Sequence, residues 1–141
     1  DHHNSNLYDY IIESELAHQK RVVYDGKSFL VFIPHATRYN GEIRIIYKND
    51  KKMDQWGLDE IEEISYIYKR LFEKWEDYNV EQIAFNVVIH TYPLNGDYDD
   101  LFRTHFHIIP RKFNFGGFEL STDLFVCGTD PEDLAEFLRF D

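Results

Sequence analysis

Three histidines have the spacing of a shared chemical site. His105 and His107 are two residues apart in a strand-like segment, Thr104–Ile109. Side chains of a strand alternate between its faces, so both imidazoles are expected on one face, roughly 7 Å apart. His90 ends the preceding strand-like segment and would lie beside them if the two strands pair. Three neutral imidazoles are a normal ligand set for zinc or ferrous iron, with water or a carboxylate, such as one from the acidic loop Tyr92–Asp100, as the fourth ligand.

The same residues also have a catalytic interpretation. An imidazole can attack phosphorus and hold a nucleotidyl group as a phosphoramidate, while a second imidazole or a backbone carbonyl orients it. His105 would then be the nucleophile and His107 its support. A structural role is the third interpretation. Metal binding is favoured over both, because two histidines share a face and a third can join them.

Residues after the histidine strand are candidates for ligand contacts. Arg111 and Lys112 could bind phosphate, although solvent exposure explains them equally well. Glu119 could accept hydrogen bonds from sugar hydroxyls, or be a surface carboxylate. Gly116-Gly117 is not a phosphate-binding loop, because no lysine followed by serine or threonine comes after it, so a plain bend is expected there.

Helices and strands must position these residues. The expected helices are Leu7–His18, Leu58–Tyr78 and Pro131–Phe140. The expected strands are Arg21–Tyr24, Ser28–Ile33, Glu42–Tyr47, Gln82–Ile89, Thr104–Ile109 and Leu124–Cys127. The long helix is indicated by apolar residues at three- and four-residue steps, namely Leu58, Ile61, Ile64, Leu71 and Trp75. The nearly continuous apolar run of Gln82–Ile89 predicts a central strand.

This order of elements predicts an α+β fold, with a mainly antiparallel sheet and a long helix and a C-terminal helix packed on it. The 141 residues, 43% of them hydrophobic, suit one domain, which we place at residues 7–141. Residues 1–6 are interpreted as a tail or as residues added for purification. Because Met53 is the only methionine, we expect either a trimmed chain or a piece of a longer protein.

Composition argues against several classes of protein. The net charge of -11 disfavours a protein that coats nucleic acid, because an acidic surface repels phosphate backbones. No apolar run approaches the ~18 residues that a membrane-spanning helix needs. The single cysteine, Cys127, cannot form an internal disulfide, so a cytoplasmic location is expected.

Several segments together resemble one protein family. His105–Arg111 (HFHIIPR) resembles the end of the histidine-triad signature, in which histidines alternate with apolar residues before a Pro-Arg or Gly-Gly turn. The order and spacing of further segments are similar to the C-terminal half of galactose-1-phosphate uridylyltransferases: Leu7–Ile12, Arg21–Tyr24, Phe32–Ile43, Ile45–Lys48, Ile89–Pro93 and Gly116–Leu120.

The resemblance implies a HIT-like fold and a part in nucleotidyl transfer. Enzymes of this family consist of two HIT-like domains, form dimers, and transfer UMP between hexose 1-phosphates through a histidine of an N-terminal His-Pro-His motif. The implied partners are a nucleotide sugar or sugar phosphate, an N-terminal HIT-like domain and a second copy. The resemblance also implies a zinc or iron site at His90, His105 and His107, and sugar contacts from Phe118 and Glu119.

The chain departs from the family pattern at several positions. It contains no His-Pro-His motif, and Arg103 replaces the first histidine of a full triad. Arginine cannot relay a proton near neutral pH, which weakens a triad hydrolase built on His105. A second type of metal site in the family uses a Cys-x-x-Cys pair and a histidine, whose positions correspond here to Asn6, Asp9 and roughly Asp50.

Three functions follow from these observations. The first is the C-terminal domain of a uridylyltransferase-like enzyme, with a histidine metal site and sugar-phosphate contacts. The second is a stand-alone nucleotide hydrolase or transferase with His105 as nucleophile. The third is a non-catalytic HIT-like module for ligand binding or dimerisation.

Overall fold

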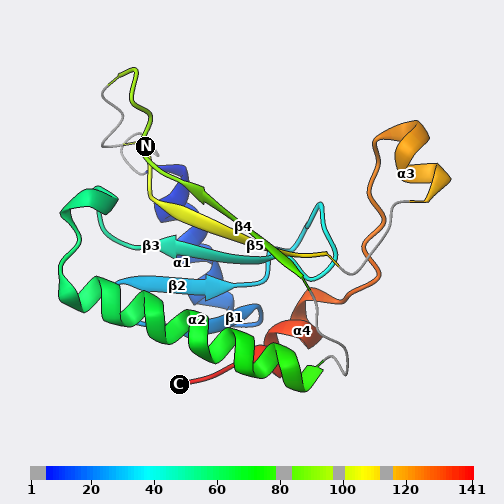
Figure 1. Cartoon of the computed structure of the whole chain (residues 1–141), viewed down its shortest axis with the longest axis horizontal. Coiled ribbons are helices and arrows are strands. Elements are labelled where there is room, and N and C mark those ends of the chain that lie inside the picture. Colours follow the sequence, from blue (N-terminus) through cyan, green and yellow to red (C-terminus); the bar gives the residue numbers. More distant parts are fainter. Residues whose placement is uncertain (1–5, 79–83, 97–100, 112–115) are drawn as a thin grey trace.

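A computed structural model describes residues 6–78, 84–96, 101–111 and 116–141. In these residues the chain forms a five-stranded antiparallel sheet with the order β1-β2-β3-β5-β4 (Figure 1). Its strands are β1 (Val22–Asp25), β2 (Phe29–Phe32), β3 (Ile43–Tyr47), β4 (Phe85–His90) and β5 (His105–Pro110). The predicted α+β class is confirmed.

Local sequence explains where the helices begin. They are α1 (Leu7–His18), α2 (Leu58–Tyr78), α3 (Gly117–Thr122) and α4 (Pro131–Leu138), with a 3-10 turn at Met53–Gln55. Asn6 caps α1 by accepting hydrogen bonds from two backbone amides, and Asp130 caps α4 in the same way. Asn6 therefore belongs to the folded domain rather than to the tail. Among the described residues, no helix is both long and apolar enough to cross a bilayer.

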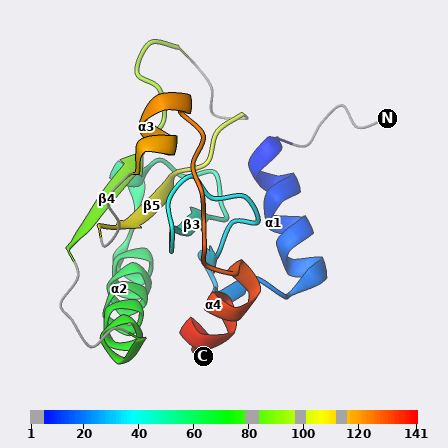
Figure 2. The ribbon, with the colours of Figure 1, turned by 90° about the vertical axis from the view of Figure 1, so that its right-hand side faces the viewer.

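Helices cover the two faces of the sheet unequally. α1 and α2 lie on opposite sides of it (Figure 2). The larger core lies on the α2 side and includes Ile64, Ile67, Leu71 and Trp75. On the other face, α1 packs over a smaller apolar cluster from β1, β2 and β3. The part of this second face formed by β5 and β4 carries the histidines.

The apolar stripe of α2 differs at its start from the prediction. Ile64, Leu71 and Trp75 are buried as expected, but Leu58 is 78% exposed and Ile61 is 49% exposed. The first turn instead buries the carboxylate of Glu60, which accepts hydrogen bonds from the Gly57 amide and the Lys51 ammonium. These contacts hold Glu60 in the first turn, where Leu58 and Ile61 stay exposed.

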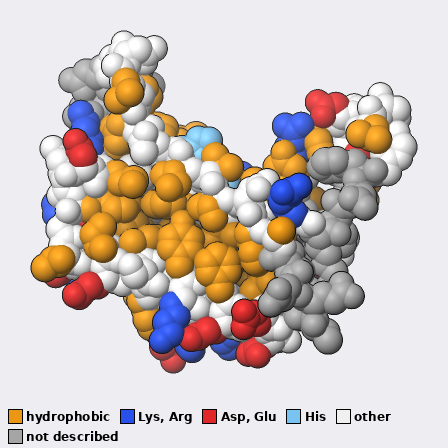
Figure 3. All heavy atoms as spheres, viewed as in Figure 1, with side chains coloured by type: hydrophobic (Ala, Val, Ile, Leu, Met, Phe, Trp, Pro, Cys, Tyr) orange, Lys and Arg blue, Asp and Glu red, His pale blue; other side chains and the backbone are white. Residues whose placement is uncertain are grey.

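The predicted central position of the Gln82–Ile89 strand is wrong. β4 lies at the edge of the sheet and pairs only with β5 among the described residues. Val87, Val88 and Ile89 are each at least 40% exposed, although their apolar run suggested burial on both faces. An apolar area is visible on the face of the molecule that shows α2 and β4 (Figure 3). The hydrophobic run correctly indicated a strand, but the position of that strand in the sheet depends on which strands pair with it.

The segment after β5 also differs from the prediction. Leu124–Cys127 forms no strand, because it packs beside residues 37–40 through side-chain contacts rather than through a backbone ladder. Gly116 is not a plain bend: it is the N-cap of α3, and Gly117 begins that helix. In Figure 1, α3 stands away from the sheet.

Candidate metal centre

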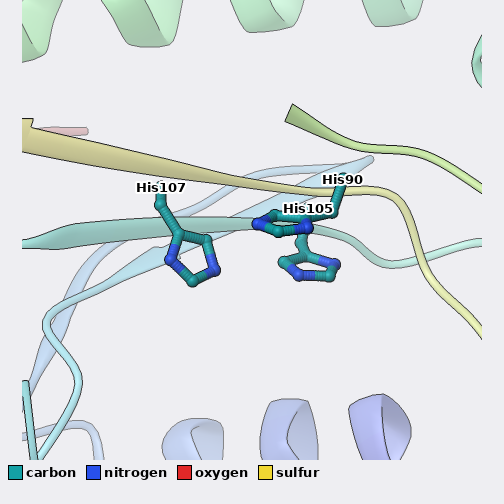
Figure 4. A group of neighbouring side chains, drawn as sticks. All are labelled: His90, His105 and His107. Atoms are coloured by element: carbon teal, nitrogen blue, oxygen red, sulfur yellow. The ribbon is translucent and has the colours of Figure 1, made fainter. Parts of the chain in front are cut away.

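The three histidines lie together on one face of the sheet (Figure 4). His90 ends β4 and stands opposite His105 on β5, while His107 stands opposite Val88. One ligand nitrogen of each histidine lies within 4.8 Å of the other two. The ring centroid of His90 is 4.5 Å from that of His105 and 4.9 Å from that of His107. The predicted convergence is confirmed, whereas metal binding stays a prediction.

The alternation of β5 explains this placement. Phe106 and Ile108 are buried in the core on the α2 side, whereas His105 and His107 are only partly buried on the opposite face. Burying two large apolar side chains fixes the register of the strand, because a slip of one residue would place both imidazoles in the core. The core therefore holds the histidines on the open face.

Hydrogen bonds orient two of the imidazoles. His105 Nδ1 lies 2.9 Å from the carbonyl oxygen of Arg103, and His107 Nδ1 lies 3.1 Å from Oε1 of Glu42. A carbonyl and an ionised carboxylate only accept hydrogen bonds, so each Nδ1 carries a proton, and in the neutral ring Nε2 then presents a lone pair. Such contacts fix the ring orientation of metal-binding histidines. The arrangement suits Nε2 of both residues to metal ligation or to nucleophilic attack.

Glu42 and Arg44 belong to this site, although the sequence analysis gave them no role. Glu42 is buried, and its Oε1 also accepts a hydrogen bond of 3.1 Å from Nε of Arg44. Burial alone would raise the pKa of Glu42, but the hydrogen bonds from His107 and Arg44 hold it below its ordinary value. Two charged residues in an otherwise apolar strand were the sequence signal for this pair.

Two of the imidazoles, His90 and His105, are held in their neutral form near neutral pH. The pKa of His105 is lowered to about 4, chiefly by burial; the hydrogen bond to the Arg103 carbonyl opposes this shift, and the nearby His90, His107 and Arg44 add to it. Burial also lowers the pKa of His90, followed by the effects of His107 and Arg44. Neutral imidazole is the form that binds a metal or attacks phosphorus.

Aromatic rings and an ion pair tie α1 to the cluster. The ring centroid of His105 is 5.0 Å from that of Tyr8 and 5.4 Å from that of Phe102. Arg103 pairs with Asp9 at 3.2 Å. The positions that correspond to the second type of metal site thus make structural contacts: Asn6 caps α1, Asp9 binds Arg103, and the Asp50 carbonyl accepts a hydrogen bond from Tyr92.

Two of the four predicted substrate-contacting residues line a pocket on the same face. The pocket has a volume of about 640 Å³, and Arg111 and Glu119 line it together with Arg38. Its floor includes Val88 and Ile109, which share the histidine face of β4 and β5 because side chains alternate. The pocket therefore extends the histidine face.

The remaining predicted site residues are not placed in this pocket. Phe118 is 54% exposed on α3 and is not among the residues that line it. Lys112 lies outside the described residues, as do Asp97, Asp99 and Asp100 of the acidic loop.

The lowered pKa of His105 predicts acid sensitivity of the metal-free domain. Its pKa is about 4 in the folded state and about 6.5 in the unfolded state, so between these values the unfolded state binds the extra proton. The free energy of unfolding should therefore fall as the pH drops from 6.5 towards 4, and should lose this dependence above 6.5. Thermal unfolding in a chelator across this range would measure it. His105→Asn should flatten the curve, and parallel curves for the two proteins would contradict the assignment.

Known proteins are similar to this chain in sequence and in fold. No family model matches the chain. It is 31% identical over 128 residues to ADP-glucose phosphorylase of Arabidopsis thaliana, covering 87% of this chain and 36% of that protein. It is 27% identical over 107 residues to galactose-1-phosphate uridylyltransferase of Saccharomyces cerevisiae, covering 75% and 29%. The chain thus spans about a third of the length of these curated relatives.

Solved structures share the fold. A uridylyltransferase mutant superposes with a TM-score of 0.81 at 23% identity, over 96% of this chain and 46% of that one. A zinc-bound histidine triad family protein from Mycobacterium smegmatis superposes with a TM-score of 0.59 at 17% identity, over 96% and 91%. These likenesses confirm the predicted HIT-like fold. In sequence, the chain is similar to a nucleotide-sugar phosphorylase and to a galactose-1-phosphate uridylyltransferase, in agreement with the predicted family resemblance.

Proposed function

We propose that this chain is the C-terminal, metal-binding half of a nucleotidyltransferase that acts on sugar phosphates. The observation that carries the proposal is the convergence of His90, His105 and His107, with Nδ1 of two of them tied to hydrogen-bond acceptors. The relatives support the class of reaction, because one is named as a uridylyltransferase and the other as a phosphorylase of a nucleotide sugar. The specific reaction proposed is UMP transfer between hexose 1-phosphates.

The residues present fit zinc or iron. Three imidazole nitrogens suit either ion, and the open face leaves room for a further ligand. Such an ion would tie β4 to β5 and place positive charge beside a bound phosphate. The chain's own part is to hold the imidazoles of His107 and His105 in place through Glu42 and the Arg103 carbonyl, and to bind sugar phosphate through Arg111 and Glu119.

Additional contacts belong to the same proposal. Phe118 on α3 would contact the substrate sugar, as the family resemblance implies. Lys112 would bind a substrate phosphate. The nucleophile would come from a His-Pro-His motif in an N-terminal HIT-like domain of the same protein. Such an enzyme would form a homodimer in the cytoplasm.

A second candidate function is nucleotidyl transfer to His105 itself. The lone pair on Nε2 and the lowered pKa favour it. Attack of Nε2 on phosphorus would form an N–P bond and break the P–O bond to the leaving group, which departs with the electron pair. Arg103 disfavours this route, because its guanidinium is paired with Asp9 and relays no proton.

Elemental analysis of tag-free protein tests the first proposal. Wild-type protein prepared without chelator should carry close to one zinc or iron per chain, and His105→Ala should lose it. Absence of both metals from the wild-type protein would refute the metal site.

Intact mass separates the second candidate from the first. A nucleotidyl adduct after incubation with a nucleotide sugar, absent in His105→Ala, would favour His105 as nucleophile. Binding of the sugar nucleotide without adduct or turnover, even with a supplied N-terminal domain, would instead indicate a non-catalytic module.

A further inference from the structure

An ion pair joins helix α1 to the strand that carries two of the histidines. Both carboxylate oxygens of Asp9 on α1 lie 3.2 Å from Nη2 of Arg103, which comes two residues before His105. The Arg103 side chain is only 12% exposed, and the Asp9 side chain is 32% exposed. Salt and water screen a sheltered pair less than a pair at the surface, so this contact can hold its two partners in place.

The guanidinium also holds the backbone just before His105. Nη1 of Arg103 donates to the carbonyl oxygen of Phe102 over 3.1 Å, while Nη2 binds Asp9. The N–H donors of arginine lie in one rigid planar fork, so the two contacts have a fixed relation to each other. The position of Asp9 therefore restrains the peptide group between Phe102 and Arg103.

The same backbone segment orients the ring of His105. The carbonyl oxygen of Arg103 lies 2.9 Å from Nδ1 of His105, so Nε2 is the nitrogen that a metal would bind. A backbone carbonyl on the far side of a metal-binding histidine fixes the orientation of its ring. The contacts thus form a chain from α1 to the cluster, from carboxylate to guanidinium, from guanidinium to backbone, and from backbone carbonyl to imidazole.

The first turn of α1 is itself fixed in place. Oδ1 of the buried Asn6 accepts hydrogen bonds from the amides of Tyr8 and Asp9, over 2.8 and 3.1 Å. The ring centroid of Tyr8 lies 5.0 Å from that of His105. One capped turn therefore presents a carboxylate to Arg103 and an aromatic ring to His105.

We propose that Asp9 and Arg103 are positioning residues that set the orientation of His105 through the carbonyl of Arg103. This inference rests on the proposed function and deepens it, because it makes the docking of α1 control how tightly the cluster binds its metal. Neither residue would touch the ion, and each acts on it through His105. Because such coupling is reciprocal, a bound ion should in turn hold α1 against the sheet.

Zinc titrations of Asp9→Ala and Arg103→Met test the proposal. Each substitution should weaken zinc binding about tenfold to a hundredfold, the usual effect of losing a group that orients a metal ligand. The double variant should bind zinc no more weakly than the weaker single variant, because both residues act through one pair. Asp9→Glu keeps a carboxylate and should retain most of the affinity. Competition with a chelator of known zinc affinity measures these dissociation constants.

Glu15→Gln is the matched control on the same helix. The buried Glu15 pairs with Arg21 over 2.7 Å, near the other end of α1. Loss of this pair should lower the melting temperature of the domain and leave its affinity for zinc unchanged. If Asp9→Ala shows that same pattern, the role of Asp9 is structural only and the proposal fails.

Nitrogen NMR of the imidazoles separates this inference from the metal site itself. In chelator-treated wild-type protein in mildly alkaline buffer, the ring proton of His105 should lie on Nδ1, and Asp9→Ala should mix the two tautomers. If the wild-type protein binds no zinc, the proposed function fails and the tautomer alone decides. A mixture in Asp9→Ala would then support the positioning role, and an unchanged tautomer would overturn it.

Discussion

Removing the metal with a chelator should lower the melting temperature of this domain by roughly 10 °C. An ion that binds only the folded state adds about 4 kcal/mol when its concentration is a thousand times Kd, and each kcal/mol shifts the melting temperature by a few degrees in a domain of this size. The effect should be large here, because the ion would join β5 to the edge strand β4 through His90, His105 and His107. Differential scanning calorimetry of tag-free protein with and without chelator measures it.

The histidine variants should behave as one unit. His90→Ala, His105→Ala and His107→Ala should each lose most of the bound metal rather than a third of it. Each should also melt at nearly the same temperature with and without chelator. His18→Ala and His35→Ala are the matched controls, because both residues are exposed and lie outside the cluster. Full metal content in all three cluster variants would rule out this ligand set.

Phe106→Ala should destabilise the domain by about 3–5 kcal/mol, the range for truncating a buried aromatic residue. Phe106 is 3% exposed and packs against Trp56 and Tyr68 on the α2 side. Because it lies between His105 and His107 on β5, its loss should also weaken metal binding without removing a ligand. Urea denaturation and metal titration measure the two effects.

Val87→Ala is the matched control for this core substitution. Val87 lies on β4 and is 43% exposed, so shortening it should change the free energy of unfolding by much less than the loss of Phe106. Equal effects of the two substitutions would show that the packing of Phe106 does not stabilise β5.

Local signals in the sequence predicted the parts of the fold that depend on neighbouring residues. The bounds of Leu7–His18 and Leu58–Tyr78 were predicted correctly. The signals for a helix, which are a capping residue and apolar residues spaced three or four apart, lie within the segment itself. The convergence of His105 and His107 followed from strand alternation alone. His90 joined them because β4 pairs with β5 as expected.

Features that depend on distant segments were not predicted. β4 lies at the edge of the sheet because β5, its one partner among the described residues, pairs on its other side with β3. The contact of Glu42 with His107 joins residues 65 positions apart, and no local pattern contains it. The segment Leu124–Cys127 has the composition of a strand but finds no sheet edge to extend.

The outer edge of β4 has a practical consequence for handling this domain alone. The amide of Arg111 donates to the carbonyl of Ala84, so alternation turns the backbone groups of Phe85, Val87 and Ile89 away from β5. The strand FNVVIH contains no lysine, proline or acidic residue, the features by which soluble proteins protect such edges. Because this edge is unpaired among the described residues, we expect concentrated solutions of the isolated domain to associate edge to edge, and a charged side chain placed at Val87 should prevent it.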